Sequence, residues 1–103
     1  MKTGIELIAE ERQRQIEKEG WTKEHDDKQY GALAIAGASY ALDTVAKYKE
    51  LKRTWAKVFH STASLIWPYG IEWFKPTPDD PVRQLTKAGA LIAAEIDRLQ
   101  RVK

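Results

Sequence analysis

The 103-residue chain contains no cysteine, and its four prolines all fall within residues 67–81. Without cysteine it has no disulfide framework, no thiolate nucleophile and no cysteine-based zinc or iron–sulfur site. Histidine, aspartate and glutamate are therefore the expected metal ligands. The clustered prolines mark residues 67–81 as a segment that cannot form a regular helix.

The chain also lacks long hydrophobic runs and a large excess of either charge. No apolar run approaches the roughly 20 residues of a membrane span, and Glu6 places an acid too early for a signal peptide. The formal charge of +2 comes from 17 basic and 15 acidic side chains, interleaved as on a solvated helical surface. We expect one cytoplasmic domain spanning residues 1–103 that does not contact a membrane. The charge pattern gives no support for nucleic-acid binding.

Helix signals cover most of the chain outside the proline-rich segment. Thr3 and Glu6 form a capping-box pattern for a first helix over residues 3–18, and Gly20 ends it as a left-handed C-cap. A second helix runs through residues 31–41, and helical apolar spacing predicts a third over residues 48–66. We expect an all-α fold, a small bundle of about four helices with a long aromatic and proline-rich loop before the last helix.

The last helix is expected to begin at Pro81, after a cap by Asp79 or Asp80, and to end near Arg101. Helical spacing gives it one apolar face, the side expected to pack against the bundle. That face consists of Leu85, Ala88, Ile92, Ile96 and Leu99.

An acidic turn places three carboxylates and an imidazole in four consecutive residues, Glu24, His25, Asp26 and Asp27. Such a group could hold a divalent cation if a distant glutamate completed the shell. Contiguous ligands cannot all face one point, however. The alternative is an acidic helix start, in which Asp26 or Asp27 is the N-cap of the second helix.

Polar side chains interrupt the inner face of the first helix. Arg12 and Gln15 share this face with Ile8, and buried polar groups need partners. Glu11 could meet Glu95 of the last helix and form a polar or metal site inside the bundle. The alternative is a buried arginine–glutamate pair that fixes the register of the helices.

The proline-rich segment carries four large aromatic residues, Trp67, Tyr69, Trp73 and Phe74. Their rings could stack on a nucleobase while Lys75 meets a phosphate. Alternatively, the segment folds back and plugs the open end of the bundle.

Several blocks of the sequence, in order, resemble a family of small uncharacterised phage and prophage proteins. The blocks are Glu11-Arg-Gln-Arg-Gln15, Glu19-Gly-Trp-Thr-Lys-Glu-His-Asp-Asp27, Gly31-Ala-Leu-Ala34, Trp67-Pro-Tyr69, and Lys87-Ala-Gly-Ala-Leu-Ile92 with Ala94-Glu-Ile-Asp-Arg-Leu99. The resemblance spans nearly the whole chain and names no activity.

A weaker resemblance is to MazG-like proteins of the all-α nucleoside triphosphate pyrophosphohydrolase superfamily. It rests on the first helix with its glycine turn and on the alanine-rich last helix. Those enzymes hold magnesium with a Glu-Glu-x-x-Glu motif and a Glu-x-x-Asp motif. Residues 33–41 and 83–87 have no carboxylate where these motifs would lie.

The first hypothesis is a phage-type helical protein that binds a nucleotide or nucleotide-derived ligand. If it is catalytic, the resemblance implies a metal-dependent nucleoside triphosphate pyrophosphohydrolase, with Mg²⁺ suited to oxygen ligands. The expected metal ligands are Glu11, Glu24, Asp26, Asp27 and Glu95. The expected ligand-binding residues are Arg12, Gln15, Trp21, His25, Trp67, Trp73 and Lys75.

The second hypothesis is a non-enzymatic interaction module. It would bind a host or phage protein through its aromatic segment, because exposed tryptophan and tyrosine are enriched in interface hot spots. Under either hypothesis we expect a homodimer.

Overall fold

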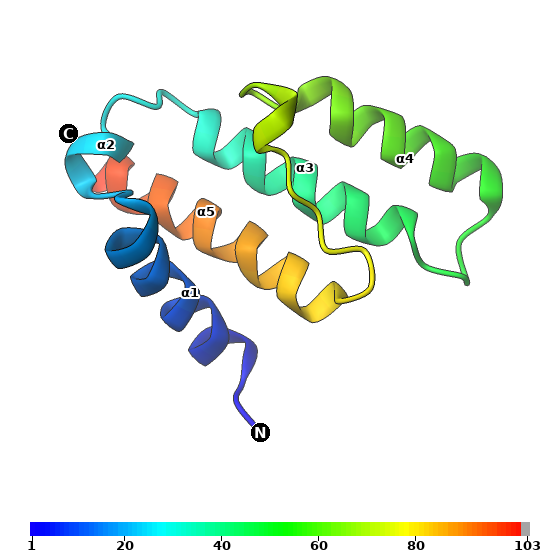
Figure 1. Ribbon diagram of the computed structural model, residues 1–103, viewed down its shortest axis with the longest axis horizontal. Coiled ribbons are helices and arrows are strands. Elements are labelled where there is room, and N and C mark those ends of the chain that lie inside the picture. Colours follow the sequence, from blue (N-terminus) through cyan, green and yellow to red (C-terminus); the bar gives the residue numbers. More distant parts are fainter. Residues whose placement is uncertain (102–103) are drawn as a thin grey trace.

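The computed structural model describes residues 1–101, which form five α-helices and one short 3₁₀ helix, with no strand (Figure 1). The expected all-α bundle with a long loop before its last helix is confirmed. No helix in this part of the chain combines the length and the apolar character needed to cross a membrane. The elements are α1 (Gly4–Glu19), α2 (Lys23–Asp26), α3 (Ala32–Ala46), α4 (Arg53–Ile66), η1 (Ile71–Trp73) and α5 (Pro81–Arg101).

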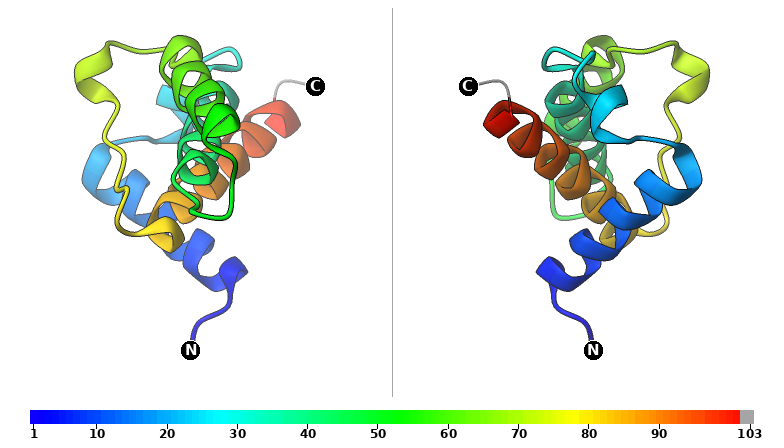
Figure 2. Two further views of the ribbon diagram at one scale, coloured as in Figure 1. Left: turned by 90° about the vertical axis from the view of Figure 1, so that its right-hand side faces the viewer. Right: turned by 90° about the vertical axis from the view of Figure 1, so that its left-hand side faces the viewer.

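The long helices pack as neighbours in the order α4, α3, α5, α1. Helix α3 contacts both α4 and α5, and α1 contacts the other side of α5. The segment 67–80 and the C-terminal end of α1 both stand off the same side of this arrangement (Figure 2). The two sides of the molecule are therefore different: loops cover one, and the other exposes helix surface.

Local signals at both ends of α1 are confirmed. The Thr3 hydroxyl accepts a hydrogen bond from the Glu6 amide at 3.2 Å, and the Glu6 carboxylate accepts one from the Thr3 amide at 2.9 Å. Gly20 ends the helix with φ +72°, a left-handed conformation that glycine adopts without strain.

The predicted N-cap of the second long helix is wrong. Neither Asp26 nor Asp27 caps α3. The N-cap of α3 is Gly31, whose φ is +93°. The acidic turn instead lies in α2, whose N-cap is Thr22, with its hydroxyl 3.4 Å from the His25 amide. The third predicted helix begins at Arg53 rather than near Tyr48.

Small residues bring α3 and α5 close together. The buried core consists of Leu33, Ala36 and Tyr40 from α3 with Ala88, Leu91 and Ala94 from α5. A Cβ atom on Gly37 would lie 3.0 Å from the Ala88 carbonyl oxygen and 3.0 Å from Cγ1 of Ile92. A side chain at position 37 would therefore push the two helices apart.

The predicted inner face of α5 is wrong except at Ala88. Leu85, Ile92, Ile96 and Leu99 are 40%, 44%, 52% and 52% exposed. The helix turns another face inward, on which small residues permit close packing and polar residues find partners. The buried residues of α5 are Gln84, Ala88, Ala90, Leu91, Ala94, Glu95 and Arg98.

Candidate functional site

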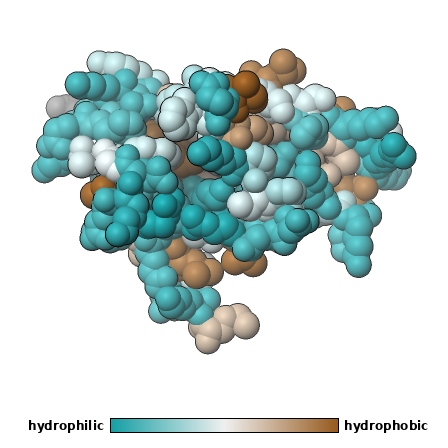
Figure 3. Space-filling model, viewed as in Figure 1, coloured by the Kyte–Doolittle hydropathy of each residue, from teal (hydrophilic) through white to brown (hydrophobic). Residues whose placement is uncertain are grey.

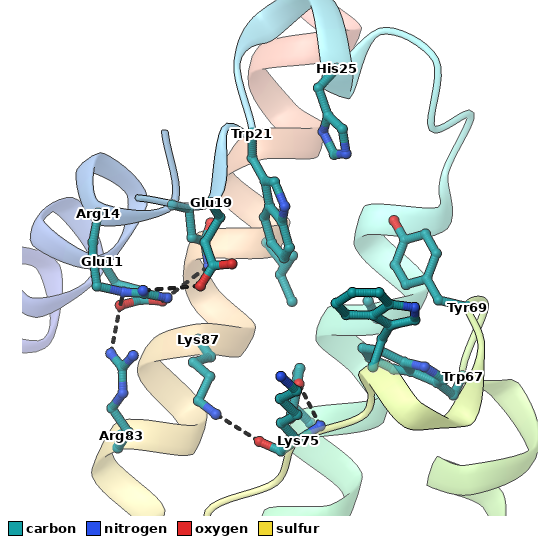
Figure 4. Close-up of a pocket in the computed structure, with 15 residues that line it drawn as sticks. Glu11, Arg14, Glu19, Trp21, His25, Trp67, Tyr69, Lys75, Arg83 and Lys87 are labelled. Carbon is teal, nitrogen blue, oxygen red and sulfur yellow. Dashed lines mark hydrogen bonds and ion pairs between the residues drawn. The ribbon is translucent and has the colours of Figure 1, made fainter. Parts of the chain in front are cut away.

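A cavity of about 480 Å³ opens on the side of the molecule that carries the loop (Figure 4). Residues of α1, α2, α3, α5 and the segment 67–75 line it. This volume falls within the range of roughly 300–1,000 Å³ typical of small-molecule sites. The cavity has an aromatic part and a charged part.

Rings from two distant segments face the cavity. Trp21 and His25 stack with their centroids 5.8 Å apart and an interplanar angle of 7°. Across the cavity, Trp67 lies edge-on to Tyr69 at 5.5 Å and to Tyr40 at 5.4 Å. Figure 4 shows Trp21 on one side and Trp67 with Tyr69 on the other. A flat ring could enter between them.

Backbone contacts hold these rings in place. The left-handed turn at Gly20 lets the Trp21 amide bond to the Gln15 carbonyl at 3.1 Å, and Arg12 donates to the Trp21 carbonyl at 3.2 Å. In the loop, the Trp67 indole N–H donates to the Gly70 carbonyl at 3.0 Å. The aromatic part of the cavity is therefore largely preformed.

A buried carboxylate organises the charged part. Glu11 is 3% exposed and accepts two hydrogen bonds from Arg14, at 2.9 and 3.0 Å. Arg83 of α5 donates to the same carboxylate at 2.5 Å. Arg14 also reaches Glu19 at 3.1 Å. Glu11 thus links α1 to α5 and fixes two guanidinium groups at the cavity wall.

Two lysines complete the charged part. The Lys87 ammonium donates to the Lys75 carbonyl at 2.8 Å and lies 5.0 Å from the centre of the Tyr40 ring. The Lys75 ammonium lies 5.6 Å from the centre of the Trp73 ring. With Arg14 and Arg83, four cationic side chains line the cavity against the carboxylates of Glu11 and Glu19. The charge balance favours an anionic ligand.

Burial and neighbouring charges shift the pKa values of these groups. Burial raises the pKa of Glu11, but hydrogen bonds from Arg14 and Arg83 lower it more, so the net pKa lies below its ordinary value. Burial lowers the pKa of Lys87, and the nearby Arg83 lowers it further, with Glu11 opposing. Glu11 is therefore held charged, whereas Lys87 loses its proton more easily than an exposed lysine.

Acid should weaken the fold through Glu11. Because its folded-state pKa is depressed, its stabilising contribution is present above the ordinary glutamate pKa and is lost as the pH falls through the folded-state value. Glu11→Gln should lower the free energy of unfolding at pH 7 by about 1.5–3 kcal/mol, because it weakens charge-assisted hydrogen bonds. The variant should also lose less stability than the wild type when the pH falls from neutral to acidic. Urea unfolding measures both, with Glu24→Gln as the exposed control. An unchanged acid sensitivity in Glu11→Gln would contradict this assignment.

Gln15 contributes an acceptor without a partner. The side chain is 2% exposed and lines the cavity, and its amide nitrogen lies 3.3 Å from Glu11 Oε2. This contact fixes the amide orientation, because the opposite one would bring two oxygens together. Within residues 1–101 the Gln15 Oε1 atom has no hydrogen-bond partner. This oxygen is itself inaccessible to solvent, so it is an unsatisfied acceptor inside the cavity wall.

The structure brings together seven of the predicted site residues. One was predicted as a metal ligand and six as ligand-binding residues, and all seven line the cavity. They are Glu11, Gln15, Trp21, His25, Trp67, Trp73 and Lys75. Arg12 does not line the cavity, because it pairs with Asp26 at 2.5 Å beneath the Trp21 turn.

The predicted metal ligands are not gathered at one point. Asp26 is fully buried against Arg12 and His25, Glu95 pairs with Arg98 at 2.6 Å, and Asp27 pairs with Arg101 at 2.7 Å. Glu24 is exposed. Across the described residues, no group of three or more histidines, aspartates and glutamates is placed to hold a metal ion. Magnesium binding stays a prediction, without a preformed site in residues 1–101.

Arg14, Arg83 and Lys87 were not among the predicted site residues. Arg83, Lys87 and Leu91 are spaced four residues apart and therefore share one face of α5. This spacing was visible in the sequence. The large aliphatic residues of the same helix form a clearer periodic pattern, and this pattern predicted the wrong face of α5 as the buried one.

No family model matches the chain, and comparison with curated proteins and with solved structures also gives no significant match.

Proposed function

We propose that the cavity binds a nucleotide or a nucleotide-derived ligand. The observation that carries this proposal is the meeting of aromatic rings and four cationic side chains in one cavity. A base would stack among the rings near Trp21 and Trp67. Its phosphates would lie toward Arg14, Arg83 and Lys87, because guanidinium and ammonium groups bind phosphate oxygens. The ligand agrees with the one implied by the MazG-like resemblance, which itself stays a prediction.

Binding is favoured over turnover. A pyrophosphohydrolase of the expected kind needs carboxylates that are free to hold a metal ion. Both cavity carboxylates are engaged: Glu11 by Arg14 and Arg83, and Glu19 by Arg14. A cation placed there would have to displace the arginines.

The packing of the loop supports a ligand over a protein partner. Trp67 and Phe74 contact Tyr40, at centroid distances of 5.4 and 5.2 Å, and both are partly buried. Trp73 and Ile71 are 63% and 64% exposed. Most of the aromatic surface of the loop thus packs on the protein itself. Little of it is free to bind a protein partner, as the alternative of an interaction module requires.

Isothermal titration with nucleoside mono- and triphosphates, with and without magnesium, tests the proposal. We expect binding that tightens with the number of phosphates, and no release of pyrophosphate. Absence of binding by every nucleotide, with no change in thermal stability, would contradict it. Pyrophosphate release would overturn the preference for binding alone.

Lys87 should make this binding depend on pH. An anionic ligand favours the charged ammonium, so affinity should decline as the pH rises through the depressed free-state pKa of Lys87. Lys87→Gln should bind more weakly at neutral pH and lose this alkaline dependence, whereas Lys57→Gln, an exposed lysine of α4 outside the cavity, should match the wild type. Titrations at neutral and alkaline pH measure both. Equal pH profiles for Lys87→Gln and the wild type would count against a role for Lys87.

A further inference from the structure

The exposed face of α5 carries a regular stripe of large aliphatic residues. The stripe alternates spacings of three and four residues, the pattern of a coiled-coil seam. In the rest of this section "the α5 stripe" means Val82, Leu85, Gly89, Ile92, Ile96 and Leu99. Its five aliphatic side chains are 40–61% exposed.

Helix α1 covers one position of the α5 stripe and leaves the others open. A Cβ atom on Gly89 would lie 2.5 Å from Cδ1 of Ile8, so Ile8 occupies the space above this glycine. One turn earlier on α1, Ile5 is 83% exposed. The α5 stripe is therefore open on both sides of this position, at Val82 and Leu85 and along Ile92, Ile96 and Leu99.

The α5 stripe and the cavity occupy opposite sides of the helix. At about 100° per residue, Lys87, which lines the cavity, points roughly away from Leu85, Ile92 and Ile96. The side that carries the loop faces the viewer in Figure 3 and is mostly hydrophilic. A molecule docked on the α5 stripe would leave the cavity open.

We propose that the α5 stripe is the interface of a symmetric homodimer, with α5 of one protomer packed against α5 of its partner. A seam with alternating spacings of three and four residues fits another helix with the same spacing. A two-fold axis requires a surface that complements itself.

The residues beside the α5 stripe fit a second copy. The accessible ones are Thr86, Ala93 and Gln100, and none of them is charged. On the other flank, Ala88 and Glu95 are buried, at 3% and 9% exposed, and Arg98 pairs with Glu95 at 2.6 Å. Two copies can therefore face each other without like-charge repulsion, which would otherwise destabilise such a pair.

The size of the surface also fits a dimer. The five aliphatic side chains with Ile5 together expose on the order of several hundred Å², on both sides of the position that Ile8 covers, compared with roughly 300–600 Å² for the largest apolar patch of a typical monomer. A standard interface buries about 800 Å² on each partner. The polar ends of neighbouring side chains would supply the remainder.

Light scattering after size exclusion tests the interface. The wild type should have twice the mass of the 11.8 kDa chain, and Ile96→Glu should shift it to the monomer mass with unchanged helical circular dichroism. Leu99→Lys is a second variant on the α5 stripe. Leu65→Glu is the matched control, because Leu65 is 83% exposed on α4 and lies off the stripe.

The proposal is overturned if the wild type is monomeric at every concentration measured. It is also overturned if both variants on the α5 stripe remain dimeric, or if Leu65→Glu dissociates as they do. Nucleotide titration of the Ile96→Glu monomer should give the wild-type affinity, since the interface and the cavity lie on opposite sides. This readout separates a failed dimer from a failed ligand site.

Discussion

Trp21→Ala should weaken nucleotide binding about 5- to 150-fold, because loss of one base-stacking partner costs roughly 1–3 kcal/mol. Trp21 stacks on His25 and forms one side of the cavity, so its removal leaves a base without a flat surface there. Isothermal titration with the tightest-binding nucleotide measures the change. Trp21→Phe should recover part of the affinity, since it restores an aromatic ring.

The matched control for this experiment is Trp55→Ala. Trp55 is 54% exposed and stacks on Phe59 of α4 at 6.0 Å, away from the cavity. Its loss should leave the affinity unchanged. Equal affinities for Trp21→Ala and the wild type, with both proteins folded, would place the ligand elsewhere.

Arg12→Ala should be the most destabilising change, at about 3–5 kcal/mol, the usual cost of removing one partner of a buried ion pair. The Asp26 side chain is fully buried, and Arg12 donates to it at 2.5 Å. Without Arg12, the buried carboxylate loses this ion pair and keeps the contact with the His25 ring nitrogen at 3.0 Å. Urea unfolding at neutral pH gives the free energy of unfolding.

Arg101→Ala provides the comparison for Arg12→Ala. Arg101 binds Asp27, the next residue of the same turn, at 2.7 Å, but both side chains are substantially exposed. Exposed pairs contribute about 0–1 kcal/mol. If the two arginine variants lost similar stability, burial of Asp26 would not be the source of the effect.

Arg12 also connects stability with binding. The same guanidinium donates to the Trp21 carbonyl at 3.2 Å, so it holds the turn that carries the ring. The acidic turn, which resembled either a metal motif or a helix cap, is thus a structural support for one side of the cavity. The sequence alone contained both partners of this ion pair, 14 residues apart, but no signal that paired them.

Local signals predicted the ends of helices where one or two adjacent residues decide the conformation. The Thr3 and Glu6 capping box, Gly20 and Pro81 all act within one turn of the chain, and all were correct. The predicted cap of α3 is wrong, because Gly31, in a left-handed conformation, takes the N-cap position and the aspartates lie in the turn before it.

Partners distant in sequence explain why the orientation of α5 was wrong. Gln84 is 1% exposed because its side-chain amide donates to the Asp43 carboxylate at 3.0 Å and to the Tyr40 carbonyl at 3.2 Å. These bonds span more than 40 residues. Hydropathy assigns Gln84 to the surface, and only the packing of α3 on α5 satisfies it inside. The same packing brings Arg83 and Lys87 to the cavity.

The positions of the tryptophans allow ligand binding to be followed by intrinsic fluorescence. Three of the four tryptophans, Trp21, Trp67 and Trp73, line the cavity, and Trp55 lies outside it. In a Trp55→Phe variant, the indole emission would come from the cavity alone. A planar ligand that enters among these rings would change that emission directly, so occupancy could be followed in solution without any label.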